Sequence, residues 1–289
     1  MKIIIRDNIK YQLDTYKKTA IVIGYKDKPV DVIIPEYIEY KHEKYKVTEI
    51  GKHAFNWCDS LTSITIHDSI TKICPFAFFK CKILTSVTIH GSVTFIGHGA
   101  FQNCKELKSV FIPNSVTFIG DGVFFNCENL TSITIPYTVT HIGDCAFQHC
   151  KRLKSVNILN NVTEIGCNTF DNIGLTLPKR YTEDGKLIAY KAFYTDMTCR
   201  KFQYEEGKTF EIKGEKIKCC HRGFHACTNP LDVFNYYYGE IGKDIVIHEV
   251  YLSGDIDEHN DDSKVCASKI EIGRRLSLKD INEIINTTY

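Results

Sequence analysis

"LTSITIPYTVTHIGDCAFQHC", residues 130–150, is one unit of an internal repeat that decides the fold. A cysteine recurs every 23 residues, at Cys58, Cys81, Cys104, Cys127 and Cys150. Three apolar columns keep the same step: Leu61, Leu84, Leu107, Leu130 and Leu153; Ile50, Ile73, Ile96, Ile119, Ile142 and Ile165; and Phe55, Phe78, Phe101, Phe124, Phe147 and Phe170. Repeats of about 20–29 residues rich in Leu and Ile are typical of solenoids, in which each unit buries its apolar face on its neighbours.

Each part of the unit has its own pattern. In "ITI", apolar and polar residues alternate, which predicts a short strand with Ile133 and Ile135 inward and Thr134 outward. "TVTHIG" is a second extended segment, which a glycine closes. "CAFQHC" is expected to be a tight turn or a short helix whose Ala, Phe and final Cys point inward.

The cysteine column is expected to be a stack of buried thiols, because free cysteine packs as a small hydrophobe. Equivalent residues of adjacent rungs lie about 4.8 Å apart, so the column does not converge four thiols on one metal ion. The 13 cysteines are an odd number, and no apolar run near the start resembles a signal peptide. These features predict reduced thiols and a cytoplasmic location.

The blocks "IGxxAFxxC" and "LxSITIPxxV" recur in this order, and they resemble the BspA-like leucine-rich repeat. The resemblance implies a solenoid over residues 46–178, preceded by a strand-rich cap at residues 1–45. "KRYTEDGK" predicts a linker at residues 179–186, because it is charged and contains glycine. Residues 187–289 lack the repeat and are expected to form a small domain, so the fold class is α+β.

The function of a solenoid depends on its exposed columns. Five phenylalanines occupy columns that hold polar residues in other units: Phe79, Phe95, Phe111, Phe118 and Phe125. They predict a protein-binding patch, with burial against a second core layer as the alternative. The net charge of +1 favours neither nucleic acid nor an acidic membrane surface, and no apolar run is long enough to span a bilayer. The chain is therefore interpreted as a non-enzymatic, protein-binding scaffold without a cofactor.

The second domain shows its elements in order. "LIAYKAF", "DIVIHEVYLSG" and "KVCASKIEIG" are predicted strands, and "TNPLDVFNYY" is a predicted helix with Thr228 or Asn229 as its N-cap. "SLKDINEIIN" is a final helix, with Ser277 and Asp280 in a capping-box-like arrangement. Leu278, Ile281, Ile284 and Ile285 lie on one face of this helix.

The second domain also shows two resemblances. The segments "YKAF", "CCHRGFHACTNPLDVFNYY" and "SKVCASKI" resemble an uncharacterised domain of phage and gut-bacterial proteins, which implies no established activity. The element order is similar to that of ADP-ribosyltransferases, and this would make Lys191, His225 and Glu271 the catalytic residues. The chain has lysine where that family has Arg or His, and it lacks the Ser-Thr-Ser motif. The alternative to a non-enzymatic scaffold is therefore that this domain binds a nucleotide or another small molecule.

"CCHRGFHAC", residues 219–227, is the densest run of potential ligands. Cys220, His225 and Cys227 are candidate metal ligands, although no second CxxC pair completes a zinc site. Cys227 or Cys220 could instead form a nucleophile pair with His225. The third interpretation is a turn at Arg222–Gly223 with packed cysteines and a locally hydrogen-bonded histidine.

Overall fold

The computed structural model describes residues 2–159, 162–214, 217–219, 223–236, 239–240, 244–259 and 263–287. The chain divides into two compact units. The first comprises Met1–Val162 with Asp171–Leu175, and the second comprises Thr163–Phe170 with Thr176–Tyr289. The second unit therefore begins before the predicted boundary at residue 178.

The first unit begins with three antiparallel strands, β1 (Lys2–Arg6), β2 (Ile9–Asp14) and β3 (Thr19–Tyr25). Alternate residues of β2 are buried, namely Ile9, Tyr11 and Leu13. β6 (Glu43–Ile50) pairs in parallel with β3 and antiparallel with β5 (Tyr37–Tyr40). These strands supply a paired edge on which the first rung of the repeat is built.

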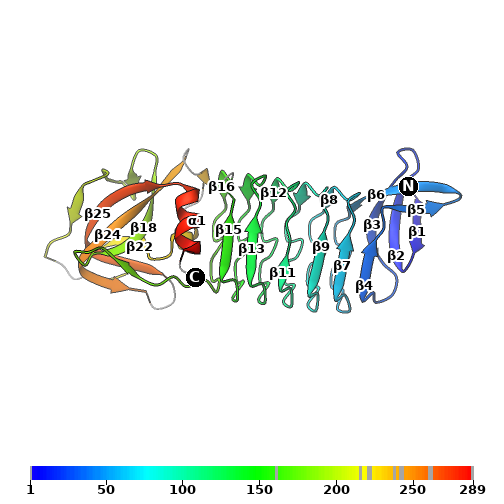
Figure 1. The fold of residues 1–289 in the computed structure, drawn as a ribbon, viewed down its shortest axis with the longest axis horizontal. Helices are drawn as coiled ribbons and strands as arrows, with labels where there is room; N and C mark the ends of the chain where they lie inside the picture. The colour runs from blue at the N-terminus through cyan, green and yellow to red at the C-terminus, as the bar shows by residue number, and fades with distance from the viewer. Residues whose placement is uncertain are drawn as a thin grey trace. The chain divides into compact units, whose positions relative to one another are not determined.

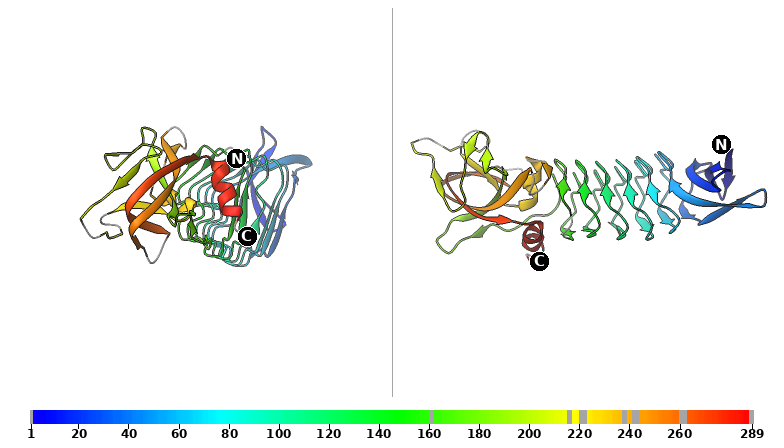
Figure 2. Two further views of the ribbon diagram at one scale, coloured as in Figure 1. Left: turned by 60° about the vertical axis from the view of Figure 1, so that its left-hand side comes forward. Right: turned by 90° about the horizontal axis from the view of Figure 1, so that it is seen from above.

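The repeats form two parallel ladders of short strands, which Figures 1 and 2 show as a stack of similar rungs. One ladder continues from β6 through β8 (Lys72–Ile73), β10 (Phe95–Ile96), β12 (Phe118–Ile119) and β14 (His141–Ile142). The other contains β4 (Asp31–Ile34), β7 (Ser63–Ile66), β9 (Ser86–Ile89) and β11 (Ser109–Val110). β13 (Ser132–Ile135) pairs with β15 (Ser155–Ile158). The predicted solenoid is confirmed, because residues 23 positions apart pair directly, as Phe95 does with Phe118.

The core of each rung repeats in the next. Phe55, Phe78, Phe101, Phe124 and Phe147 are fully buried and stacked, with neighbouring ring centroids 5.1–5.6 Å apart. The thiols of Cys81, Cys104, Cys127 and Cys150 donate at 3.0–3.2 Å to the carbonyls of Phe55, Phe78, Phe101 and Phe124. The cysteine column is therefore buried, as predicted, and four of its thiols also donate hydrogen bonds. No described cysteine forms a disulfide.

The second unit is built around an antiparallel sheet. The strands of this sheet are β17 (Arg180–Tyr181), β18 (Leu187–Tyr194), β21 (Thr209–Glu211), β22 (Phe224–Cys227), β24 (Ile245–Glu258) and β25 (Lys264–Leu276). Two further pairs lie outside it: β19 (Thr198–Cys199) pairs with β20 (Phe202–Gln203), and β16 (Glu164–Ile165) pairs with β23 (Gly239–Glu240). β18 and β25 each pair with both β22 and β24, which closes these four strands into a ring. β17 pairs with β18, so the predicted linker contributes a strand to this sheet.

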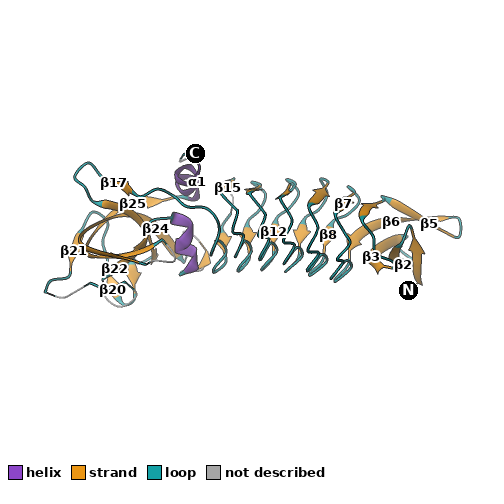
Figure 3. Ribbon diagram, turned by 90° about the horizontal axis from the view of Figure 1, so that it is seen from below, coloured by secondary structure: helices purple, strands orange, loops and turns teal. Residues whose placement is uncertain are grey.

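Among its described residues, the second unit also contains two short helices (Figure 3). The segment predicted as a helix at residues 228–237 forms a 3-10 helix, η1 (Pro230–Asn235), whose N-cap Asn229 accepts from the N–H of Leu231. α1 (Leu278–Asn286) begins at the N-cap Ser277 with the predicted capping box and buries its four predicted apolar residues. Neither of these described helices has the length and apolar content needed to cross a membrane.

Candidate functional site

Two columns of the solenoid turns have left-handed backbone conformation. The first contains His53, Phe76, Gly99, Gly122 and Cys145, with φ between 54° and 60°. The second contains Trp57, Lys80, Asn103, Asn126, His149 and Asn172, with φ between 55° and 62°. Glycine and asparagine adopt this conformation readily, whereas a bulky residue pays a steric cost there. The bulky residues in these columns therefore indicate a role other than ease of folding.

The first rungs bring these bulky residues together. We define the turn cluster as His53, Trp57, Phe76, Phe79 and Lys80. The Phe76 ring stacks on His53 at 5.4 Å and meets Phe79 edge-on at 5.8 Å. Trp57 meets Phe79 at 6.2 Å, and the Lys80 ammonium lies 3.9 Å from the centre of the Trp57 ring. Trp57 remains 54% exposed, so the cluster presents aromatic surface and a cation to solvent.

A second aromatic group follows the short strands. We define the strand ladder as Phe95, Phe118 and His141, which occupy equivalent positions of β10, β12 and β14. Phe95 and Phe118 stack at 5.2 Å, and Phe118 and His141 stack at 4.7 Å. All three are half-buried. Their stacking holds the rings in a defined orientation and leaves part of each accessible.

The five predicted phenylalanines are distributed over several places. Phe79 belongs to the turn cluster, Phe95 and Phe118 belong to the strand ladder, and Phe125 meets His149 edge-on. Phe111 is 69% exposed, but it follows β11 and therefore lies on the other ladder of strands. The sequence reasoning missed Trp57 and Phe76. The sequence could have indicated them, because each stands at a turn position where several other repeats have glycine or asparagine.

The second unit contains a partly open cavity of about 1150 Å³. Phe202, Tyr204, Phe210 and Phe224 line it and form a connected group of rings, with Phe202 and Tyr204 only 4.7 Å apart. Four cationic side chains also line it: Lys191, Arg200, Lys201 and Lys264. Two acidic residues, Glu211 and Asp244, also line it, so positive charge is in excess among the lining residues that the structure describes.

Lys191 is the buried cation of this cavity. It lies in β18 between the buried residues Ala189 and Phe193 on the inward face, and it is only 6% exposed. Its Nζ donates to the His225 carbonyl at 2.8 Å and lies 5.8 Å from the centre of the Tyr204 ring. Burial lowers the pKa of Lys191, because desolvation disfavours the charged ammonium. An anionic ligand in the cavity would stabilise that charge.

His225 faces the opposite side of β22 from Phe224 and Ala226. Burial lowers its pKa to about 4, and the positive charges of Lys191, Arg200 and Lys264 contribute in the same direction. Its buried Nε2 has no hydrogen-bond partner among the described residues. The imidazole is therefore neutral at physiological pH and available as a ligand.

The structure places the other predicted site residues as follows. Glu271 does not line the cavity with Lys191 and His225, because its carboxylate binds Lys186 Nζ at 2.9 Å. Cys227 is buried two residues after His225. Cys220 lies outside the described residues. The structure instead groups His225 with Cys219 and Cys266, whose ligand atoms all lie within 4.8 Å of one another.

The parallel ladders and the repeated rungs are those of a leucine-rich-repeat solenoid. Residues 48–176 match a family model described as BspA type Leucine rich repeat region, in six copies. Residues 187–284 match a domain of unknown function, DUF7666. The predicted resemblances to the BspA-like repeat and to an uncharacterised domain are thereby confirmed. A comparison with curated proteins finds no match.

Solved structures of bacterial leucine-rich-repeat proteins are similar to this chain. A leucine rich cell surface protein from Faecalibacterium prausnitzii is 27% identical, with 65% of this chain and 60% of that chain covered and a TM-score of 0.53. The T. pallidum leucine rich repeat protein is 26% identical, with 54% and 81% covered and a TM-score of 0.45. The chain thus spans about 60% of the length of the F. prausnitzii protein. The expected cytoplasmic location was wrong, because this similar protein is a cell surface protein.

Proposed function

We propose that the repeat region binds a partner protein through the turn cluster and the strand ladder. The observation that carries the proposal is the placement of Trp57 and Phe76 in left-handed positions, where several other rungs have asparagine or glycine. Aromatic side chains supply much of the energy of protein interfaces. The similar protein from F. prausnitzii is a cell surface protein, which supports a cell surface as the place where this partner is bound.

The chemistry of the turn cluster indicates what the partner presents. Its rings offer apolar surface, and Lys80 adds a positive charge beside Trp57. A segment with apolar side chains next to an acidic residue would complement both features. The strand ladder would extend this contact along the rungs, since solenoids commonly bind along a continuous face.

Selection of peptides from a random library on the immobilised full chain tests the proposal. We expect selected peptides to combine apolar residues with an acidic residue. A Trp57→Asn/Phe76→Gly variant, which restores residues used in other rungs, should bind them at least about tenfold more weakly while keeping its fold. Phe111→Thr is the matched control, because it also restores a residue of its column but lies on the other ladder. Equal loss in both variants, or no loss in the first, would refute the proposal.

A second candidate function belongs to the second unit, namely binding of a small anionic ligand that carries a ring. It rests on Lys191, a buried cation in a cavity lined by aromatic side chains. Such cavities with few placed polar groups are typical ligand sites. Nucleotides belong to this class of ligand. The proposal concerns binding alone, because Glu271 does not line the cavity with Lys191 and His225 as an ADP-ribosyltransferase site would require.

Calorimetric titration of the full chain with NAD and with ATP tests this second candidate. We expect heat of binding from at least one of them, and its loss in Lys191→Met, which preserves the volume of the side chain. Lys213→Met, at an exposed position outside the cavity lining, should bind normally. Binding that is unchanged in Lys191→Met, or no heat with either nucleotide, counts against a nucleotide site.

A further inference from the structure

We propose that Cys219, His225 and Cys266 form a binding site for one zinc ion. This inference concerns the second unit and does not depend on the proposed binding of a partner protein. The three ligand atoms come from the segment at 217–219, from β22 and from β25, and all lie within 4.8 Å of one another. Two thiolates and one imidazole are a common zinc ligand set.

The strand register places two of the ligands opposite each other. His225 of β22 pairs directly with Cys266 of β25 in an antiparallel arrangement. Directly opposite residues project their side chains on the same face of a sheet, with Cβ atoms about 4.5–5.5 Å apart. This face is the one opposite Phe224, Ala226, Val265 and Ala267, which pack into the main core of the unit. The pair is thus fixed by the sheet itself rather than by a loop.

The third ligand is held in place from a neighbouring strand. The backbone N–H of Cys219 donates to Asp257 Oδ2 at 2.6 Å. Asp257 of β24 pairs with Cys266 of β25. The carboxylate therefore fixes the Cys219 backbone beside Cys266 and would serve as an outer support of the metal site.

Gly223 makes the approach of this segment possible. A Cβ on Gly223 would lie 3.0 Å from Ile217 Cγ2 and 3.1 Å from Cys266 Sγ. Ile217, Cys219 and Cys266 form a small apolar cluster on which Ile212 packs. An apolar shell of this kind limits the access of water to bound metal.

The chemistry of the ligands agrees with their geometry. The His225 Nε2 is buried without a hydrogen-bond partner among the described residues, a costly state that metal coordination would relieve. Zn–S bonds of about 2.3 Å and Zn–N bonds of about 2.0 Å place tetrahedral ligand atoms roughly 3.5–3.8 Å apart. Side-chain rotations on metal binding would bring the three atoms, which lie within 4.8 Å of one another, to this separation. Binding would release the proton of each thiol to solvent, and a water molecule would fill the fourth position.

Cobalt is the probe that tests the ligand set. The full chain is reduced, freed of reductant without air and titrated with Co²⁺. We expect one equivalent to bind, with a thiolate-to-cobalt charge-transfer band and the visible bands of tetrahedral Co²⁺. Zinc added afterwards should abolish these bands by displacement. Zinc alone should also raise the melting temperature of the second unit.

Single substitutions identify the ligands. Cys219→Ser, Cys266→Ser and His225→Ala should each weaken cobalt binding by at least about 100-fold, because even changes outside the ligand sphere cost about 10–100-fold. Cys227→Ser is the matched control, since it removes a buried cysteine two residues from His225. It should keep the spectrum and the stoichiometry. Circular dichroism establishes that each variant is folded.

Three outcomes would overturn the zinc site. The first is a reduced wild-type chain that binds no cobalt. The second is a spectrum that survives in folded His225→Ala or that is lost equally in folded Cys227→Ser. The third is a Cys219–Cys266 disulfide, detected by mass spectrometry of protein isolated without reductant. Such a disulfide would explain the proximity of the two cysteines without a metal ion.

Discussion

The residue that most constrains a rung is the glycine that follows β6, β10, β12 and β14 in the first ladder. A Cβ on Gly51 would lie 2.6 Å from the Val22 carbonyl oxygen, and one on Gly120 would lie 2.7 Å from the His98 nitrogen. In both cases the obstacle is backbone, which cannot rotate away: strand β3 for Gly51 and the preceding turn for Gly120. Glycine thus permits the close approach of the backbone at these two positions, whereas Cys74 occupies the equivalent position after β8.

Gly120→Ala should therefore destabilise the repeat region by about 1–3 kcal/mol, the usual cost of overpacking. The melting temperature measured by circular dichroism reports this change. Gly91→Ala is the control, because nothing lies within 4 Å of its Cβ position, and it should leave the melting temperature unchanged. Equal effects of the two substitutions would show that crowding between turns is not the cause.

The cysteine column makes the stability of the repeat region depend on pH. Burial raises the pKa of Cys104 and Cys127 well above the usual range and that of Cys150 to about 12. In the unfolded chain these thiols ionise near a pKa of about 8.5. Between these values the folded state binds more protons than the unfolded state, so the free energy of unfolding falls as the pH rises.

We expect urea denaturation to show a lower free energy of unfolding at pH 10 than at pH 7.5. A Cys104→Ala/Cys127→Ala variant should lose less stability between these two pH values, although it is less stable at both. Cys145→Ala, at a half-buried position outside the column, is the control and should retain the wild-type dependence. A double variant with the same dependence as the wild type would rule out the column as its source.

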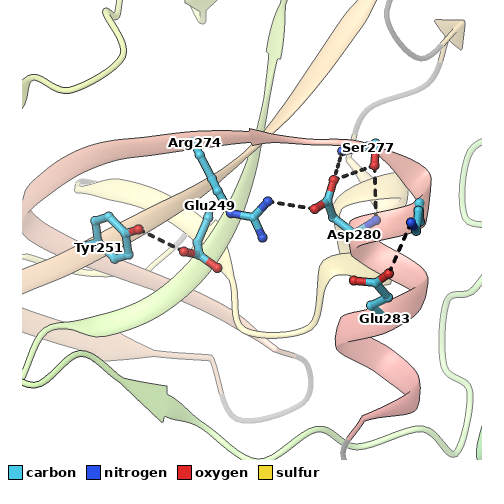
Figure 4. A network of polar contacts seen from close by, with 7 residues as sticks. Glu249, Tyr251, Arg274, Ser277, Asp280 and Glu283 are labelled. Carbon is cyan, nitrogen blue, oxygen red and sulfur yellow. Dashed lines mark hydrogen bonds and ion pairs between the residues drawn. The ribbon is translucent and has the colours of Figure 1, made fainter.

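At the scale of elements, α1 depends on its first turn (Figure 4). Asp280 Oδ2 accepts from the Ser277 N–H at 2.8 Å, and the Asp280 N–H donates to Ser277 Oγ at 3.2 Å. Arg274 Nη1 of β25 donates to Asp280 Oδ1 at 2.7 Å. The capping box and the ion pair together join the start of the helix to the preceding strand.

Asp280→Asn should increase hydrogen exchange of the α1 amides, with a loss of about 0.5–2 kcal/mol, as for other capping changes. Ser277 and Arg274 hold the pKa of Asp280 well below its usual range. The carboxylate therefore stabilises the folded state above about pH 3.9, and this contribution disappears as the pH falls toward the folded pKa. Wild-type α1 should lose protection on acidification, whereas the variant should change less. Parallel loss in both would contradict this role.

At the scale of the whole molecule, the repeat region is a stack of interchangeable rungs. Deletion of residues 94–116 removes one complete 23-residue unit and joins Val93 to Thr117. Because each rung contacts only its neighbours, the shortened chain should fold with a modest decrease in melting temperature. Deletion of residues 105–116, about half a unit, disrupts the register and should abolish cooperative unfolding in circular dichroism. If both shortened chains unfold equally cooperatively, the register of the repeats does not determine whether the repeat region folds.

The sequence alone determined the repeat region, because a solenoid places residues 23 positions apart next to each other. The period therefore predicted the ladder pairing, and the alternation in "ITI" predicted which side chains are buried, as Ile133 and Ile135 are. Ser277 and the apolar face of α1 were equally predictable, since caps and helical periodicity are local signals.

Only the tertiary structure decided which side chains meet outside the repeated contacts. In the second unit, Cys266 meets His225 through strand pairing across 41 residues, and no spacing in the sequence encodes that register. The turn cluster depends on left-handed backbone positions, which the sequence marked with glycine and asparagine in other rungs. Local patterns thus predicted the elements, whereas the sites depend on long-range pairing and on the direction in which each side chain projects.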